Sequence, residues 1–307
     1  MRKGIVIGSR GSKLAQIQAE SMLDKLQELN PELEFTLDTI VTRGDREHKV
    51  PMDRMAGVGV FVKELEEALL DGRIDLAIHS LKDMPTEIPN GLSLAAVVER
   101  LDPRDVLVSK TTRLSELAPG SRVGTGSLRR AIQVLSYRPD LEICSIRGNI
   151  DTRLRKVASD ELDSVILAAA AMIRLGYEER ITEYLSPEHF LPSVGQGALG
   201  IEIRSGDEHI AELVSVLNHR PTQCSVVAER AFLLALGGGC RAPIAALGTP
   251  SSDTLRLDGM VAGTTGQSII KSSEEGKIFS PEQIGIRLAQ KILAMGASRL
   301  IREAKVQ

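Results

Sequence analysis

Ile5-Val6-Ile7-Gly8-Ser9-Arg10-Gly11-Ser12 begins with an apolar run and ends in a hydroxyl-rich turn. The run is typical of a short buried strand, and Ser12 suits the N-cap of a helix whose apolar residues recur from Leu14 to Leu29. The same pattern returns in Arg122-Val123-Gly124-Thr125-Gly126-Ser127, ahead of a helix expected over 128–137. Two strand-to-helix units of this kind predict two α/β lobes.

Both hydroxyl-rich turns are candidate anion sites. Free N–H groups at a helix start and neighbouring hydroxyl groups together suit an anion. The residues concerned are Ser12 in the first turn, and Thr125 and Ser127 in the second. Routine helix capping is the competing interpretation for each copy. Because each lobe carries one, we expect the two turns to face a shared cleft.

The segments between these turns alternate between strand and helix patterns. The first lobe has expected strands over 35–41, 74–78 and 92–98 and an expected helix over 61–70. The second lobe has expected strands over 106–108, 141–146 and 164–168 and expected helices over 150–157 and 169–175. After a linker at 191–200, we expect a strand over 199–203 and a helix over 207–217.

The last part of the chain has a different order, α-β-β-β-α. Helices are expected over 222–236 and 281–295, and strands over 244–247, 255–262 and 267–271. We therefore predict an α/β protein with two α/β lobes and a small α+β domain of residues 218–307 with a three-stranded sheet.

Composition excludes several classes of protein. The 307 residues carry a net charge of −3, and only 3% are aromatic, which argues against a nucleic-acid-binding protein. Three cysteines are too few for a disulfide framework, and an odd number cannot all be paired. No signal peptide and no apolar run of membrane-spanning length is evident, so we expect a cytoplasmic protein. No metal-ligand spacing and no nucleotide-binding fingerprint is present.

Leu236-Gly237-Gly238-Gly239-Cys240-Arg241-Ala242-Pro243-Ile244 places a cysteine directly after three glycines. The glycines permit backbone conformations that expose the sulfur, and a thiol beside a cation such as Arg241 is a better nucleophile. The alternative is that Cys240 is a small apolar residue in a turn.

Arginines gather where strands and loops are expected to end. Arginine recognises carboxylates and phosphates in a bidentate manner. The cluster predicts a cleft for a polyanion, although solvated faces with weak ion pairs are the alternative. Its members are Arg10, Arg43, Arg129, Arg130, Arg147, Arg153, Arg155 and Arg174.

His79-Ser80-Leu81-Lys82-Asp83 follows an apolar strand. Asp83 there can be a general acid or base, or can stabilise a cation, whereas the alternative is an aspartate that orders a turn. His79 can titrate near neutral pH, although a structural histidine is the alternative.

Taken together and in order, the motifs closely resemble those of the porphobilinogen deaminase (hydroxymethylbilane synthase) family over nearly the whole chain. They are Ser9–Ser12, Thr42–Asp45, Phe61–Leu65, His79–Asp83, Val123–Arg130, Arg147–Leu154, Val194–Gly197, Glu229–Phe232 and Gly238–Pro243.

The resemblance implies a transferase of tetrapyrrole biosynthesis. Such an enzyme condenses four porphobilinogen molecules head to tail into hydroxymethylbilane and releases ammonia. It implies a dipyrromethane cofactor, held by a thioether to Cys240, and oligopyrrole intermediates. It also implies three domains: a first lobe of residues 1–99 plus 195–217, a second lobe of residues 100–194, and the small domain of residues 218–307, which carries the cofactor loop. The two lobes are expected to be similar to those of type II periplasmic binding proteins, and the protein is expected to be a monomer.

Roles for individual residues follow from the same resemblance. Asp83 is expected to act catalytically at the pyrrole nitrogens. The expected cofactor-binding residues are Cys240, Asp83, Lys82, Ser80, Thr125, Ser127, Arg129, Arg130 and Arg147. The expected substrate-binding residues are Arg10, Ser12, Arg147, Arg153 and Arg174, and no metal is expected.

Two positions depart from the family pattern. Val58 stands where the family usually has a lysine, which removes a cation that Arg54 or Lys49 would have to replace. Gly126 stands where the family often has a serine, which removes a hydroxyl donor. A rival hypothesis is a non-catalytic, two-lobed protein that binds anions reversibly; the cysteine loop and the third domain count against it.

Overall fold

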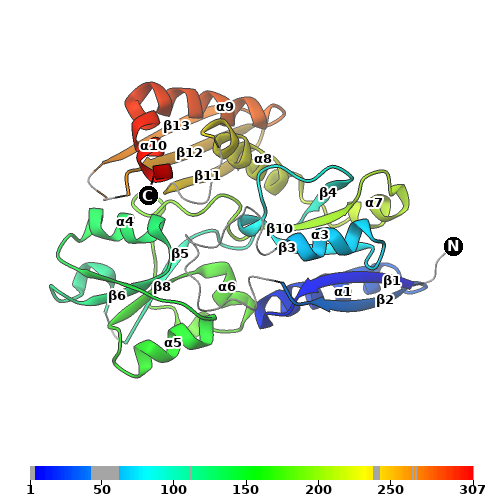
Figure 1. Cartoon of the computed structure of the whole chain (residues 1–307), viewed down its shortest axis with the longest axis horizontal. Coiled ribbons are helices and arrows are strands. Elements are labelled where there is room, and N and C mark those ends of the chain that lie inside the picture. Colours follow the sequence, from blue (N-terminus) through cyan, green and yellow to red (C-terminus); the bar gives the residue numbers. More distant parts are fainter. Residues whose placement is uncertain are drawn as a thin grey trace. The chain divides into compact units, whose positions relative to one another are not determined.

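The computed structural model describes residues 4–42, 62–110, 112–237, 243–264, 266 and 268–306 (Figure 1). The chain divides into two compact units, which are considered separately. One unit is Met1–Arg100 with Ala198–Gln223, and the other is Leu101–Gly197 with Cys224–Gln307. Within the described residues, no helix is both long enough and apolar enough to cross a bilayer.

The first unit is built on a five-stranded sheet with the order β2-β1-β3-β10-β4. The strands are β1 (Gly4–Arg10), β2 (Glu34–Ile40), β3 (Leu76–Ser80), β4 (Leu92–Val97) and β10 (Leu199–Arg204). β1 is parallel to β2 and β3, whereas β10 is antiparallel to β3 and β4. The strand predicted at 199–203, a segment from late in the sequence, thus lies inside the sheet of the first unit.

Helices cover both faces of this sheet. α1 (Lys13–Leu29) and α7 (Glu208–Ser215) pack with Ile5, Ile7, Leu76 and Ile78 in one apolar cluster. α3 (Lys63–Leu70) packs with Ala77 and Ile74 in another, on the opposite face. Because side chains alternate along a strand, Ser80 faces α1 while His79 faces α3. A single 3-10 turn, η1 (Leu81–Asp83), follows β3 directly.

The second unit begins with another five-stranded sheet, of order β7-β6-β8-β5-β9. Its strands are β5 (Asp105–Ser109), β6 (Arg122–Thr125), β7 (Glu142–Ser145), β8 (Ser164–Ala168) and β9 (Glu183–Tyr184). α4 (Leu128–Tyr137), α5 (Ile150–Ala158) and α6 (Ala169–Arg174) follow β6, β7 and β8 in the chain. The two-residue strand β9 was not predicted, because a pattern of two residues carries no periodicity.

The second unit also contains a three-stranded antiparallel sheet, β11 (Ile244–Ser251), β12 (Thr254–Ala262) and β13 (Ile269–Lys277). α8 (Arg220–Ala235) and α9 (Pro281–Ile292) pack together over a core around the fully buried Phe232. They approach closely at Gly285, where a Cβ would lie 2.3 Å from the carbonyl oxygen of Ala228. The predicted fold class, two α/β lobes and a small three-stranded domain, is confirmed at the level of these sheets.

The end of the chain differs from the prediction. The last helix was expected to run to residue 295, but α9 ends at Ile292 and a second helix, α10 (Ser298–Val306), follows. Gly296 separates them with a φ of 103°, a left-handed conformation that breaks a helix. The boundaries predicted for the three domains stay a prediction.

Candidate active site

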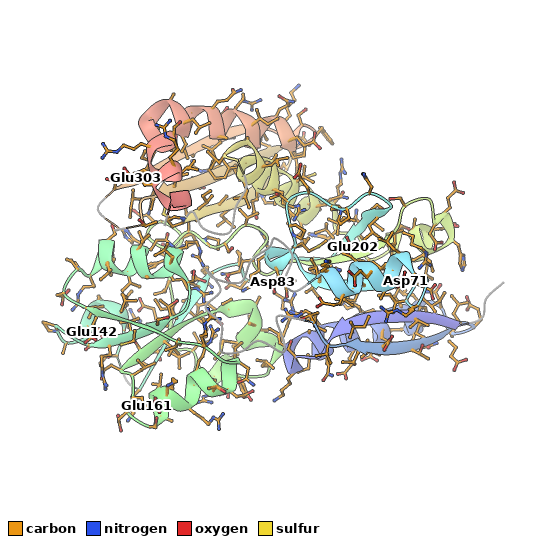
Figure 2. The ribbon with its side chains drawn as sticks, in the orientation of Figure 1. Asp71, Asp83, Glu142, Glu161, Glu202 and Glu303 are labelled. Atoms are coloured by element: carbon orange, nitrogen blue, oxygen red, sulfur yellow. The ribbon has the colours of Figure 1, made fainter. Side chains whose placement is uncertain are left out.

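In the first unit, Arg10 and Asp83 line one pocket. Arg10 ends β1, and Asp83 ends η1, so two neighbouring parallel strands deliver them to the same edge of the sheet. Nη1 of Arg10 lies 3.5 Å from Oδ2 of Asp83, and both side chains are partly exposed, at 18% and 32%. His79 and Ser80 also line this pocket. Figure 2 marks Asp83 among the side chains around it.

The other predicted site residues of this unit are Ser12, Ser80 and Lys82. Oγ of Ser12 accepts a hydrogen bond from the backbone N–H of Ala15 at 3.3 Å, so Ser12 is the N-cap of α1. The hydroxyl of Ser80 donates to Oε1 of Gln18, on α1, at 3.1 Å. Lys82 is exposed on η1. The capping prediction for Ser12 is confirmed, and a capping hydroxyl still has its proton to donate to an anion.

In the second unit, Thr125 and Ser127 form the matching turn at the end of β6. Oγ of Ser127 accepts from the backbone N–H of Arg130 at 3.5 Å and caps α4. Oγ1 of Thr125 is buried and accepts from the N–H of Ser127 at 3.2 Å. Gly126 lies between them, and a Cβ there would be 2.7 Å from the carbonyl oxygen of Ile146. The missing side chain of Gly126 therefore has a local structural reason.

Arg129 and Arg130 are buried and share a carboxylate that sequence reasoning missed. Asp105, at the start of β5, accepts from Nη1 of Arg129 and from Nη2 of Arg130, each at 2.8 Å. Nε2 of Gln196 donates to the same Asp105 at 2.8 Å. Burial alone would raise the pKa of Asp105, but the two guanidinium charges outweigh it and hold that pKa well below its ordinary value. The cofactor-binding role of both arginines stays a prediction.

Arg147, Arg153 and Arg174 form a different group. Among the described residues, none of the three has a carboxylate within ion-pair distance. Nε of Arg153 donates to the carbonyl of Gly148, and Nη2 of Arg174 donates to the carbonyl of Gly197, both at 2.9 Å.

Burial lowers the pKa of Arg174 to about 10. Burial, and then the charges of Arg130 and Arg147, lower the pKa of Arg153 to about 10 as well. Both guanidinium groups therefore stay charged at neutral pH while being partly desolvated, and Arg153 is also close to like charge. An incoming carboxylate would offset these penalties, so both arginines are suited to bind an anion.

Cys240, Val58, Arg54, Lys49, Arg43 and Arg241 lie outside the described residues, so the predictions that fall on them are not tested. The described cysteines are Cys144 and Cys224. Cys224 is buried within α8, at 2% exposure. Burial, and then the charge of Glu142, raise the pKa of Cys144, which makes it a weaker nucleophile. Neither thiol has the environment of a reactive cysteine.

Behind the first pocket lies a buried group that sequence reasoning also missed. Nε2 of His79 is 2.9 Å from Oε2 of Glu202, on β10, and Glu66 of α3 lies nearby on the same face of the sheet. Figure 2 marks Glu202 within that sheet. The available signal was a glutamate in the middle of an otherwise apolar strand, Leu199–Arg204.

Comparisons with known proteins agree on one family. The profile described as "Porphobilinogen deaminase, dipyromethane cofactor binding domain" matches residues 5–212, and that described as "Porphobilinogen deaminase, C-terminal domain" matches residues 223–294. A relative named porphobilinogen deaminase from Pelobacter propionicus is 47% identical over 297 residues, covering 97% of this chain and 96% of the relative. One of the same name from Geobacter metallireducens is 46% identical, covering 98% and 95%.

Among solved structures, a putative methionine-binding lipoprotein from Bacillus subtilis is similar with a TM-score of 0.42 and 15% identity. That similarity covers 70% of this chain and 89% of the lipoprotein.

Proposed function

The chain belongs to the porphobilinogen deaminase family, and we propose that it condenses four porphobilinogen molecules head to tail into hydroxymethylbilane, releasing ammonia. This reaction makes it a transferase of the hydroxymethylbilane synthase type. We also propose that it acts in the cytoplasm and as a monomer. Each pyrrole ring carries two carboxylates, so the growing chain is a polyanion. The observation that carries the proposal is that Arg147, Arg153 and Arg174 are each partly buried and that none of them has a carboxylate within ion-pair distance among the described residues.

The family profile names a dipyrromethane cofactor, and the described residues fit such a group. Its carboxylates match the capped helix start at Ser127 and the positive charge of Arg147. We propose that Cys240 holds it through a thioether, since neither described cysteine offers a reactive thiol. When bound, the cofactor supplies a covalent primer to which the substrate rings are added.

Asp83 has the position that the chemistry requires of a catalytic carboxylate. Loss of ammonia from the aminomethyl group of porphobilinogen leaves positive charge that the ring N–H shares. The Asp83 carboxylate, 32% exposed at the pocket, can accept a hydrogen bond from that N–H and stabilise the charge as it forms. Arg10, 3.5 Å from Asp83, keeps the carboxylate oriented and adds a positive charge that favours a substrate carboxylate.

The other predicted site residues are divided between the cofactor and the substrate. We propose that Lys82, Ser80, Thr125 and Ser127 contact the cofactor, and that Ser12 contacts the substrate. Arg147, Arg153 and Arg174 bind substrate carboxylates directly. Arg129 and Arg130 are proposed to serve the cofactor through the charge that they retain beyond Asp105, because two guanidinium groups share that one carboxylate.

Intact mass measurement tests the proposal. Wild-type protein should carry the added mass of two pyrrole rings, and Cys240→Ala should not. Cys144→Ala is the matched control, because Cys144 is a partly exposed thiol that should leave the added mass unchanged. A wild-type mass equal to that of the bare chain would refute the proposal and favour a reversible anion-binding protein.

Turnover tests the role of Asp83. Asp83→Asn should keep the fold and the attached cofactor but slow porphobilinogen consumption by at least about 100-fold, the scale of a lost acid–base group. Near-normal consumption would contradict that role.

A further inference from the structure

Glu66, Glu202 and His79 form a buried cluster behind the pocket of Asp83 and Arg10. They come from α3, β10 and β3, and their exposed fractions are 8%, 0% and 3%. Because Ile201 and Ile203 pack toward α1 and α7, the alternation along β10 directs Glu202 to the opposite face, which α3 covers. None of the three residues has a role in the proposed binding or catalysis.

Hydrogen bonding within this cluster is incomplete. Oε2 of Glu202 is 2.9 Å from Nε2 of His79. Oε1 of Glu202 and Oε1 of Glu66 are buried and have no hydrogen-bond partner among the described residues. An ionised carboxylate oxygen without a donor is costly to bury. The arrangement therefore favours a protonated carboxyl group within the cluster.

The charges of the cluster also favour bound protons. Without bound protons its net charge is −2, and two protons make it neutral. Burial, followed by the charge of Glu202, raises the pKa of Glu66 above its ordinary value. Glu66 therefore keeps a proton at pH values where an exposed glutamate has lost it.

Several other charged groups near α3 have ion-pair partners. Arg204 of β10 is paired with Asp75 and Asp207, and Arg10 of β1 is paired with Asp83. On α3 itself, Lys63 is paired with the exposed Glu67. The charged groups on α3 and on the elements packed against it, among the described residues, are Lys63, Glu64, Glu66, Glu67, Arg10, His79, Glu202 and Arg204.

We propose that the Glu66–Glu202–His79 cluster is a positioning group for this pocket, and that its two bound protons keep it uncharged while substrate carboxylates enter. The inference rests on the proposed function. His79 joins the cluster to the pocket, since it lines the pocket together with Arg10, Ser80 and Asp83. Loss of one proton as pH rises leaves a net charge of −1 behind a surface that must admit anions. A unit charge about 10 Å away, at an effective dielectric constant of about 20, weakens binding of a singly charged anion on the order of tenfold.

The pH dependence of KM tests this proposal. KM and kcat for porphobilinogen are measured from about pH 6 to about pH 10 on the holoenzyme of the wild type, Glu66→Gln and Glu67→Gln. Wild-type KM should rise at alkaline pH, while Glu66→Gln should keep a low KM, with a difference on the order of tenfold. Glu67→Gln removes the same charge from the exposed neighbour and should follow the wild type. An unchanged KM profile in Glu66→Gln, or the same shift in Glu67→Gln, overturns the proposal.

Thermal unfolding gives a second measurement that does not depend on turnover. Since the pKa of Glu66 is raised on folding, the folded protein binds more protons than the unfolded chain between the two values, and its stability falls as pH rises through them. Glu66→Gln lacks this loss, so its Tm relative to the wild type should rise with pH. A Tm difference independent of pH overturns the proposal.

A second variant and a comparison of the two assays separate failure of this proposal from failure to fold and from failure of the proposed function. If Glu66→Gln does not fold, Glu202→Gln removes a charge that raises the pKa of Glu66 and leaves the cluster less negative at high pH, so its KM should rise less than that of the wild type and its Tm relative to the wild type should rise with pH. A wild-type protein that consumes no porphobilinogen would overturn the proposed function, whereas the thermal comparison would still decide whether Glu66 holds the proton.

Discussion

Asp105→Asn removes the carboxylate that two buried guanidinium groups share. Asp105 is fully buried, and its oxygens accept from Arg129, Arg130 and Gln196 at 2.8 Å each. An asparagine keeps one acceptor oxygen but turns an NH2 group toward a donor. It also leaves two buried cations without an anion, so the damage exceeds the loss of a single hydrogen bond.

The expected loss is large for a single substitution. Removing one partner of a buried ion pair costs about 3–5 kcal/mol, and we expect the free energy of unfolding at neutral pH to fall by about that much. Asp102→Asn is the matched control three residues away. Asp102 pairs with Arg104 at 2.6 Å but is 22% exposed, and such pairs contribute about 0–1 kcal/mol.

Acidification should reduce the difference between the wild type and Asp105→Asn. Because the pKa of Asp105 is lowered on folding, the unfolded chain binds more protons than the folded protein between the two pKa values. The stability that Asp105 contributes is therefore complete above its unfolded pKa of about 3.9 and is lost as pH falls toward the folded value. Urea unfolding of wild type and both variants at neutral pH and near pH 3 measures this. A loss below about 1 kcal/mol at neutral pH, or a difference that grows on acidification, would refute the reasoning.

Two other substitutions test close contacts. Gly126→Ser would bring a Cβ within 2.7 Å of the carbonyl oxygen of Ile146, so we expect a loss of about 1–3 kcal/mol in thermal unfolding; an unchanged Tm would contradict the contact. Glu229→Gln should cost about 1–3 kcal/mol in urea unfolding, because the carboxylate of Glu229 accepts from the N–H groups of Gly195 at 2.7 Å and Gly248 at 2.8 Å and an amide has one oxygen. Equal stability would show that the amide satisfies both donors.

Features set by neighbouring residues were predictable from the sequence. The N-caps Ser12 and Ser127 depend on a hydroxyl placed three residues before the N–H that it accepts, which is a local relation. Most strands and helices also agree with their apolar periodicity. The insertion of β10 into the first sheet was not predicted from periodicity, although the resemblance to a family assigned residues 195–217 to the first lobe.

Partners far apart in sequence were not predictable. Asp105 lies 24 residues from Arg129, and Glu202 lies 123 residues from His79. Each pair forms because strand order brings two elements together, and a single sequence contains no signal of that order. Gly296 was missed for a different reason, since a glycine in a helical pattern is compatible with both a continuous helix and a break.

The arginines illustrate what this distinction means for function. In the sequence Arg129, Arg130, Arg147, Arg153 and Arg174 are equivalent candidates for an anion site. In the structure, Arg129 and Arg130 already donate hydrogen bonds to Asp105, whereas the other three have no carboxylate within ion-pair distance among the described residues. An incoming carboxylate gains most where a guanidinium group is partly desolvated and lacks an anion, which is the condition that lowers the pKa of Arg153 and Arg174 to about 10. We therefore expect the counter-ion that each arginine already has to decide which of them can receive the substrate.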